Sequence, residues 1–124
     1  MRTIARALAL FLLSWSVSGQ AQDFQKGMEA FDQGDFQTAL EEWRPLAEQG
    51  DADAQFGLGV LYRDGTGVIQ SYIDAHMWFN IAASAGNESA KGSRDRVATE
   101  MSQDDLVRAQ RLARECVERG YKDC

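Results

Sequence analysis

Apolar residues recur along this chain at intervals of three and four, the spacing that places side chains on one face of an α-helix. The clearest stretch is residues 51–86, where the pattern predicts two amphipathic helices joined by a glycine-containing loop. Leu58 and Leu61 mark a buried face of the first helix, and Trp78 and Phe79 mark that of the second. This stretch therefore predicts a helical hairpin.

The first helix of this hairpin has a second apolar face, formed by Phe56 and Val60. Two apolar faces predict neighbours on both sides of the helix. Gly57 and Gly59 lie in the same helix, and each costs about 1 kcal/mol relative to alanine. We expect these two glycines to let a neighbouring helix approach closely.

Residues 22–50 predict a first hairpin. Gly34 would end its first helix, and Asp35 is a suitable N-cap for its second. Pro45, the only proline of the chain, lies inside that second helix, where it removes one backbone hydrogen bond. We expect a kink at this point and not a break, because the apolar spacing continues beyond it.

Residues 87–120 predict a third hairpin, followed by a short tail, residues 121–124. Its first helix carries Arg94 and Asp95 at positions where the central hairpin has apolar residues, as expected of a helix with solvent beyond it. The apolar side expected for its second helix comprises Leu106, Val107, Ala109, Leu112, Ala113, Cys116 and Val117.

Glycines at the ends of the three hairpins reveal a repeat. Gly50 and Gly86 are 36 residues apart, and Gly86 and Gly120 are 34 apart. Counted back from these glycines, the second helices share apolar positions, namely Phe36 with Tyr72 and Leu106, and Ala39 with Ala75 and Ala109. The chain is therefore predicted to be all-α, an array of about three helical hairpins with its core between neighbouring units.

Residues 1–21 have the features of a secretory signal peptide. Arg2 and Arg6 precede an apolar run of eleven residues, 7–17, and small residues allow cleavage after Ala21. The run is shorter than the roughly 20 residues that span a bilayer. We therefore expect a repeat domain over residues 22–124, a periplasmic or secreted location, and no membrane insertion after cleavage.

Acidic residues outnumber basic ones, and the formal net charge is −6. Loss of Arg2 and Arg6 would leave 11 basic and 19 acidic side chains, a net charge of −8. Nucleic acid is not expected as a partner, because its binding depends on basic side chains. The acids concentrate in residues 22–64, with ten acids against three bases, whereas residues 65–124 contain nine and eight.

Few residues suggest chemistry. Cys116 and Cys124 are the only cysteines, and an even count in an exported chain favours a disulfide between them. His76 is the only histidine, which excludes a metal site built on several histidines, and we expect it to have a structural role. We expect no catalytic residue, no metal and no cofactor. Four aromatic residues are expected in the core, namely Trp43, Tyr72, Trp78 and Phe79.

The central hairpin resembles the Sel-1-like repeat family, which is related to the tetratricopeptide repeats. The resemblance is carried by Ala54-x3-Leu58-Gly59-x2-Tyr62, by Gly65-x-Gly67-Val68, and by Ala75-x2-Trp78-x3-Ala82-Ala83-x2-Gly86. The flanking hairpins would be degenerate copies. The resemblance implies a right-handed α-α superhelix whose concave face binds proteins or peptides, and it implies no fixed active site.

The function expected from these features is that of a non-catalytic interaction or adaptor module of the bacterial cell envelope, with an unknown protein or peptide as its ligand. The expected interaction surface comprises Gln55 and Arg63 on the central hairpin and Arg108, Arg111, Arg114 and Arg119 on the last helix. Weak head-to-tail self-association is one alternative. The family resemblance adds two others, a protein that binds or hydrolyses β-lactams and a regulator associated with envelope polysaccharide or stress.

Overall fold

The computed structural model describes residues 22–124, and the predicted signal peptide, residues 1–21, lies outside the described residues. Six helices and no strands make up the described part: α1 (Phe24–Asp32), α2 (Phe36–Glu48), α3 (Ala52–Asp64), α4 (Tyr72–Ser84), α5 (Glu88–Ala98) and α6 (Gln103–Glu118). None of these helices combines the length and the apolar character needed to cross a membrane.

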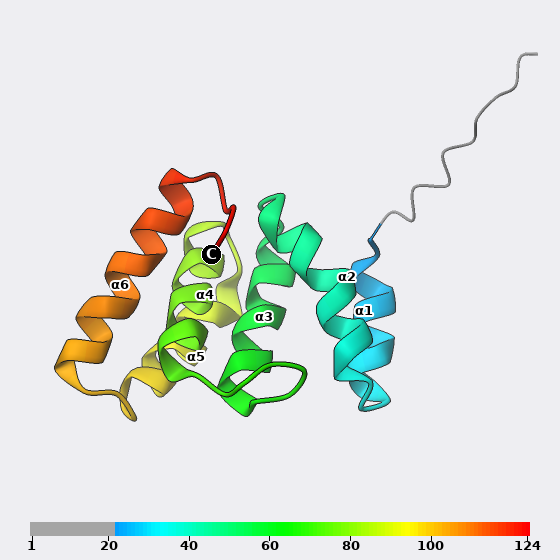
Figure 1. Cartoon of the computed structure of the whole chain (residues 1–124), viewed down its shortest axis with the longest axis horizontal. Coiled ribbons are helices and arrows are strands. Elements are labelled where there is room, and N and C mark those ends of the chain that lie inside the picture. Colours follow the sequence, from blue (N-terminus) through cyan, green and yellow to red (C-terminus); the bar gives the residue numbers. More distant parts are fainter. Residues whose placement is uncertain (1–21) are drawn as a thin grey trace, which may run out of the picture.

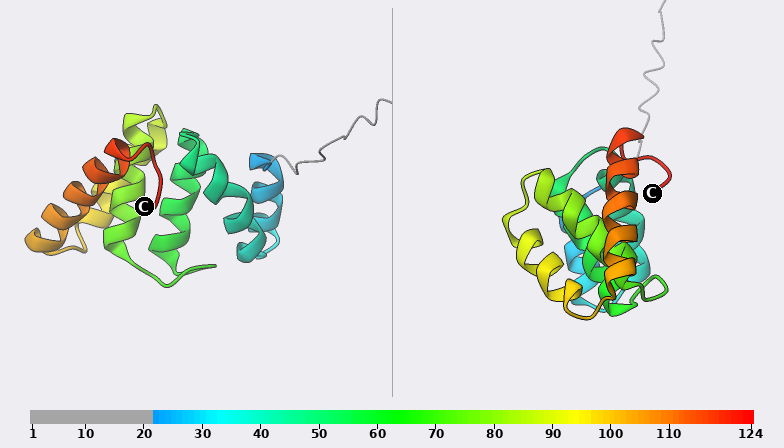
Figure 2. Two further views of the ribbon diagram at one scale, coloured as in Figure 1. Left: turned by 45° about the horizontal axis from the view of Figure 1, so that its top comes forward. Right: turned by 90° about the vertical axis from the view of Figure 1, so that its left-hand side faces the viewer.

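The helices stand side by side along the longest axis of the molecule (Figure 1). Odd-numbered helices run in one direction and even-numbered helices in the other, and the two sets form separate layers (Figure 2). Each helix from α1 to α4 packs against the next one in the chain, and α6 packs against α4. The prediction of an all-α helical-repeat superhelix is therefore confirmed.

Asp35 caps α2, as predicted, and four further helices begin in the same way. The side chains of Asp35, Asp51, Ser71, Asn87 and Ser102 each accept a hydrogen bond from the backbone amide three residues further on. Such a cap satisfies one of the amides that have no partner within the helix. Local sequence therefore sets where five of the six helices begin.

The predicted register of the repeat is visible in the backbone. Gly50, Gly86 and Gly120 follow α2, α4 and α6, and all three have positive φ angles, of 94°, 110° and 64°. Glycine adopts this conformation without the steric cost that a Cβ would add. α2 continues through Pro45 as one helix, as the apolar spacing predicts.

The two glycines inside α3 are sites of close packing. A Cβ on Gly57 would lie 2.6 Å from Cε3 of Trp43, and a Cβ on Gly59 would overlap the ring of Phe79. Both rings are almost fully buried, as predicted. The expected role of Gly57 and Gly59 is confirmed, since each lets an aromatic ring from a neighbouring helix lie directly on the backbone of α3.

Three residues predicted on buried faces are exposed instead. The exposed fraction is 38% for Tyr72, 52% for Val107 and 46% for Val117. The cause for the two valines is the arrangement of the third hairpin, in which α5 and α6 both pack chiefly against α4 and hardly against each other. α5 has few apolar residues to offer α6, so α6 buries only the narrow stripe Ala109, Ala113 and Cys116.

The tail that follows α6 folds back across the molecule. We call residues 121–124 the C-terminal clasp. Cys124 forms the predicted disulfide with Cys116, with an S–S distance of 2.00 Å. Lys122 Nζ donates to the carbonyl of Glu48 at 3.2 Å, and a Cβ on Gly50 would lie 3.3 Å from the ring of Tyr121. The clasp thus connects the last helix to the end of α2 in the first hairpin (Figure 1).

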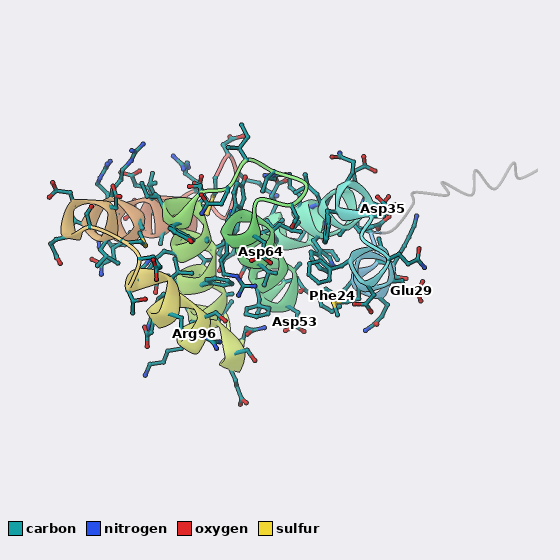
Figure 3. All side chains as sticks on the ribbon, turned by 90° about the horizontal axis from the view of Figure 1, so that it is seen from below. Phe24, Glu29, Asp35, Asp53, Asp64 and Arg96 are labelled. Atoms are coloured by element: carbon teal, nitrogen blue, oxygen red, sulfur yellow. A yellow bond between two sulfur atoms is a disulfide. The ribbon has the colours of Figure 1, made fainter. Side chains whose placement is uncertain are left out.

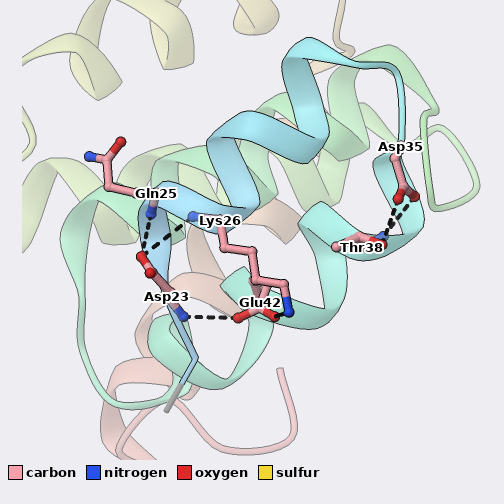
Figure 4. A network of polar contacts seen from close by, with 6 residues as sticks. All are labelled: Asp23, Gln25, Lys26, Asp35, Thr38 and Glu42. Atoms are coloured by element: carbon pink, nitrogen blue, oxygen red, sulfur yellow. Dashed lines mark hydrogen bonds and ion pairs between the residues drawn. The ribbon is translucent and has the colours of Figure 1, made fainter. Parts of the chain in front are cut away.

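A polar network joins the two helices of the first hairpin (Figure 4). Glu42 on α2 accepts hydrogen bonds from the backbone amide of Asp23, at 2.9 Å, and forms an ion pair with Lys26, at 3.1 Å. These bonds lower the pKa of Glu42, because they favour its ionised form. The only basic residue of α1 is therefore directed toward α2.

Candidate functional site

Gln55 does not belong to an exposed surface, and its predicted place there is wrong. The side chain is 0% exposed, and its Nε2 donates to the carbonyl of Ala47 at 3.1 Å. That carbonyl belongs to the last turn of α2, where carbonyl groups lack partners within the helix. α2 covers α3 at this point, so Gln55 serves packing and capping.

Arg63 is partly exposed near the end of α3. Its guanidinium makes two bonds to the carboxylate of Asp64, at 2.8 and 3.2 Å, and these bonds raise the pKa of Arg63. Arg63 lines a pocket of about 270 Å³ between α3, α4 and α5, which we call the α3–α5 pocket. The other residues that line it are Tyr72, Ser93, Arg96, Val97 and Glu100.

The arginines predicted at the last helix, Arg108, Arg111, Arg114 and Arg119, are all exposed. They differ in whether their guanidinium groups already have partners within the protein. Arg111 pairs with Glu115 at 3.3 Å, and Arg119 donates from Nε and Nη2 to two carbonyls of the C-terminal clasp. These arginines belong to α6 and its C-cap, in the layer of even-numbered helices (Figure 2), whereas Arg63 lines a pocket together with residues of α5. The structure therefore does not bring the predicted surface residues together, and their contact with a partner stays a prediction.

A smaller pocket of about 140 Å³ lies between α1, α2 and α3, and we call it the α1–α3 pocket. Its walls are the half-buried side chains of Phe24, Met28, Phe31, Phe56 and Val60, and Trp43 and Gly57 also line it. The sequence marked Phe56 and Val60 as a second apolar face of α3. This second apolar face was the feature of the sequence that could have indicated the pocket. It predicted that a neighbouring helix would cover Phe56 and Val60, and in the structure they are covered only in part.

Two carboxylates border the α1–α3 pocket: Asp32 is the last residue of α1, and Asp53 is in the first turn of α3. Because α1 and α3 run in the same direction (Figure 1), these carboxylates lie at opposite ends of the pocket. Asp53 accepts a hydrogen bond from Nδ2 of Asn87 at 2.9 Å, and Figure 3 shows Asp53 and Phe24 on the same face of the molecule. Within residues 22–124, Asp32 has no hydrogen bond or ion pair through its side chain.

One stripe of α3 joins the two pockets. Asp53, Phe56 and Val60 line the α1–α3 pocket, and Arg63 lines the α3–α5 pocket. These four residues are spaced three and four apart, so they lie along one face of the helix. The layer of odd-numbered helices therefore presents a single row of side chains with an apolar pocket at one end and a more polar pocket at the other.

His76 lies outside both pockets. It is 4% exposed, and its burial lowers its pKa, as does the positive charge of Arg94, while Asp95 acts in the opposite direction. Among the described residues its Nδ1 has no hydrogen-bond partner. Burial in the folded protein therefore favours the neutral form of this histidine, in keeping with a structural role.

We expect the stability of the domain to fall as the pH decreases below about 6.5, the ordinary pKa of histidine. The unfolded chain takes up a proton at His76 more readily than the folded protein does, so protonation favours unfolding until the lower folded pKa is reached. Urea unfolding at pH 7.5 and pH 5.5 measures this difference. The variant His76→Leu should show a smaller decrease, and an equal decrease in both proteins would contradict the prediction.

The described residues offer binding surfaces more clearly than reactive groups. No cluster of three or more His, Cys, Asp or Glu side chains within residues 22–124 could hold a metal ion. Both cysteines of the chain are joined in the disulfide. The α1–α3 pocket can bury an apolar side chain of a ligand, and the carboxylates of Asp32 and Asp53 at its ends can pair with positive charges.

Fold and surface together define an α-α helical-repeat protein with two pockets along its layer of odd-numbered helices. Residues 52–87 match the family profile described as Sel1 repeat, which spans α3, the following loop and α4. The central hairpin is therefore a Sel1 repeat, and further helices lie on both sides of it. This repeat fold is typical of protein–protein interaction modules. No curated protein matches the chain.

Proposed function

We propose that this protein is a non-catalytic binding module that works in the periplasm or outside the cell, and that it holds a peptide or protein segment against α1, α3 and α5. The observation that carries this proposal is the row of side chains on α3 that joins the two pockets. The disulfide between Cys116 and Cys124 supports the compartment, because such bonds persist in oxidising environments.

We call the two pockets, together with the row of α3 side chains between them, the groove. A groove built from packed helices has an energetic advantage as a binding surface. One apolar side chain moved fully out of water contributes about 1.5 to 3 kcal/mol. The walls of the α1–α3 pocket come from three helices that are already packed, so binding requires little ordering of the module itself. Weak self-association, β-lactam binding or hydrolysis, and recognition of envelope polysaccharide remain hypotheses that no feature of residues 22–124 specifically favours.

Site-specific photo-crosslinking in the native envelope tests this proposal. A photo-reactive amino acid at Arg96, beside the α3–α5 pocket, should give one predominant protein adduct. The same amino acid at Val107 is the matched control, because this residue is also exposed but belongs to α6, in the layer of even-numbered helices. Equal adducts from both positions, or none from Arg96, would count against a binding groove on the odd-numbered helices.

A further inference from the structure

We propose that the α1–α3 pocket binds a basic peptide segment, taking one aliphatic or aromatic side chain between two Lys or Arg residues that pair with Asp32 and Asp53. This inference rests on the proposed function, because it specifies the chemistry of the segment that the groove holds. Three observations support it: the size of the pocket, its apolar lining, and the carboxylates at its two ends.

The size and lining of the pocket fit one side chain. Its volume is about 140 Å³, and an apolar cavity of about 150 Å³ in a protein accommodates a benzene molecule. Phe24, Phe31 and Phe56 contribute aromatic walls, and Gly57 lets the ring of Trp43 lie directly on α3 as a further wall. A leucine or phenylalanine side chain would therefore fill this pocket, whereas a charged side chain would lose its hydration there.

The charge of the surrounding surface selects a basic segment. Residues 22–64 contain ten acids and three bases, and all three bases already have partners. These contacts are Lys26 with Glu42, Arg44 with the hydroxyl of Tyr62, and Arg63 with Asp64. The charges of Asp32 and Asp53 are therefore not neutralised by bases of this half of the chain. Complementary charge on a partner speeds its association and fixes its register.

The length of α1 gives the separation of the two pocket ends along the helix axis, and this separation indicates the spacing in the partner. α1 has nine residues, so Asp32 lies about 12 Å along the helix axis from Phe24, which is near the Asp53 end of the pocket. An extended peptide covers this distance with about four residues, at about 3.3 Å each. The structure therefore assigns to the partner an apolar residue with a Lys or Arg two positions before it and another two positions after it.

Selection from a random dodecapeptide library displayed on phage tests this assignment. The bait is the chain expressed from its first residue and purified with its disulfide intact. Enriched peptides should carry the basic-x-apolar-x-basic pattern, and their affinity is then measured by fluorescence anisotropy. The double variant Asp32→Lys/Asp53→Lys should weaken binding of these peptides about tenfold, because it replaces two attractive charge pairs with repulsion.

The matched control is Glu29→Lys/Glu41→Lys, which changes the net charge by the same amount at two exposed residues outside the pocket. Figure 3 shows Glu29 on α1, well away from Asp53. This control should alter the affinity less than twofold at physiological salt. A third variant, Val60→Phe, should block the pocket and abolish binding while circular dichroism confirms that it folds.

The results separate a failure of the proposed peptide chemistry from a failure of the groove as a binding site. Enriched peptides that lack basic residues, or that bind the two double variants equally, would overturn the proposed chemistry of the partner. If such peptides still compete with crosslinking at Arg96, the groove remains a binding site and only the present inference fails. If the library yields no peptide that binds the chain, both the inference and the proposed function of the groove are contradicted.

Discussion

Replacement of Trp43 by alanine is expected to lower the free energy of unfolding by about 3 to 5 kcal/mol, the cost of removing a large aromatic side chain from a packed core. Trp43 is 2% exposed and packs between Phe24 and Phe31 of α1 on one side and Gly57 of α3 on the other. It also donates from Nε1 to the carbonyl of Phe24 at 3.2 Å. This one residue of α2 therefore joins the first hairpin to the central one.

The expected loss is large relative to the total. A domain of this size has a free energy of unfolding of about 5 to 15 kcal/mol, so the first hairpin of the variant should separate or unfold at ordinary temperatures. Urea unfolding followed by circular dichroism measures the loss. In the variant, part of the helicity should be lost at a lower urea concentration than the main unfolding transition, because a repeat array can lose a terminal unit by itself.

Two controls separate the causes of this effect. Trp43→Phe keeps most of the apolar contact and removes the hydrogen bond to Phe24, so it should cost less than Trp43→Ala. Val107→Ala removes an apolar side chain that is 52% exposed and should change stability by less than about 0.5 kcal/mol. If Trp43→Ala behaved like Val107→Ala, the first hairpin would not be held to α3 through this ring.

The sequence predicted the fold well because the relevant signals are local. Ser71 and Asn87 cap helices through hydrogen bonds to amides three residues away, and such bonds depend only on neighbouring residues. The glycine register was equally readable, since Gly50 and Gly86 adopt a backbone conformation that favours glycine. A close approach at Gly57 was predicted because glycine destabilises a helix and therefore needs a compensating role. That role is the packing of the Trp43 ring against the backbone of α3.

The candidate site was less predictable because it depends on how helices meet. Gln55 has the composition of a surface residue, yet α2 covers it and uses its amide as a cap. Phe56 and Val60 have the spacing of a buried face, yet the fold leaves them half-buried as walls of a pocket. Whether α5 covers α6 could not be read from either helix alone, which is why Val107 was expected to be buried.

The disulfide adds a feature that no single helix encodes, because it determines where the C-terminal clasp lies. Cys116 is fully buried, and its bond to Cys124 closes a turn in which the amide of Tyr121 donates to the carbonyl of Cys116 at 2.9 Å. Held in this way, Tyr121 and Lys122 reach the end of α2. The bond therefore acts on two levels, by restricting the unfolded chain and by keeping the third hairpin in contact with the first.

The double variant Cys116→Ala/Cys124→Ala is expected to lower the free energy of unfolding by about 2 to 3 kcal/mol, from the loop-closure entropy of a separation of eight residues. The midpoint of thermal unfolding should fall by about 10 to 20 °C. Alanine is preferred to serine at Cys116, because a hydroxyl buried there would add a cost of its own.

Hydrogen exchange and reduction distinguish the two levels at which the disulfide acts. Loss of the clasp should speed amide exchange at Gln49, Gly50 and Asp51, whose amides lie at the end of α2. Reduction of the native protein should reproduce both effects, and reduction should leave the double variant unchanged. The control Lys122→Ala keeps the disulfide and removes only the exposed bond to Glu48, so its thermal midpoint should stay near that of the native protein. If reduction lowered stability without changing exchange at the end of α2, the disulfide would act only on the unfolded chain, and the clasp would not connect the hairpins.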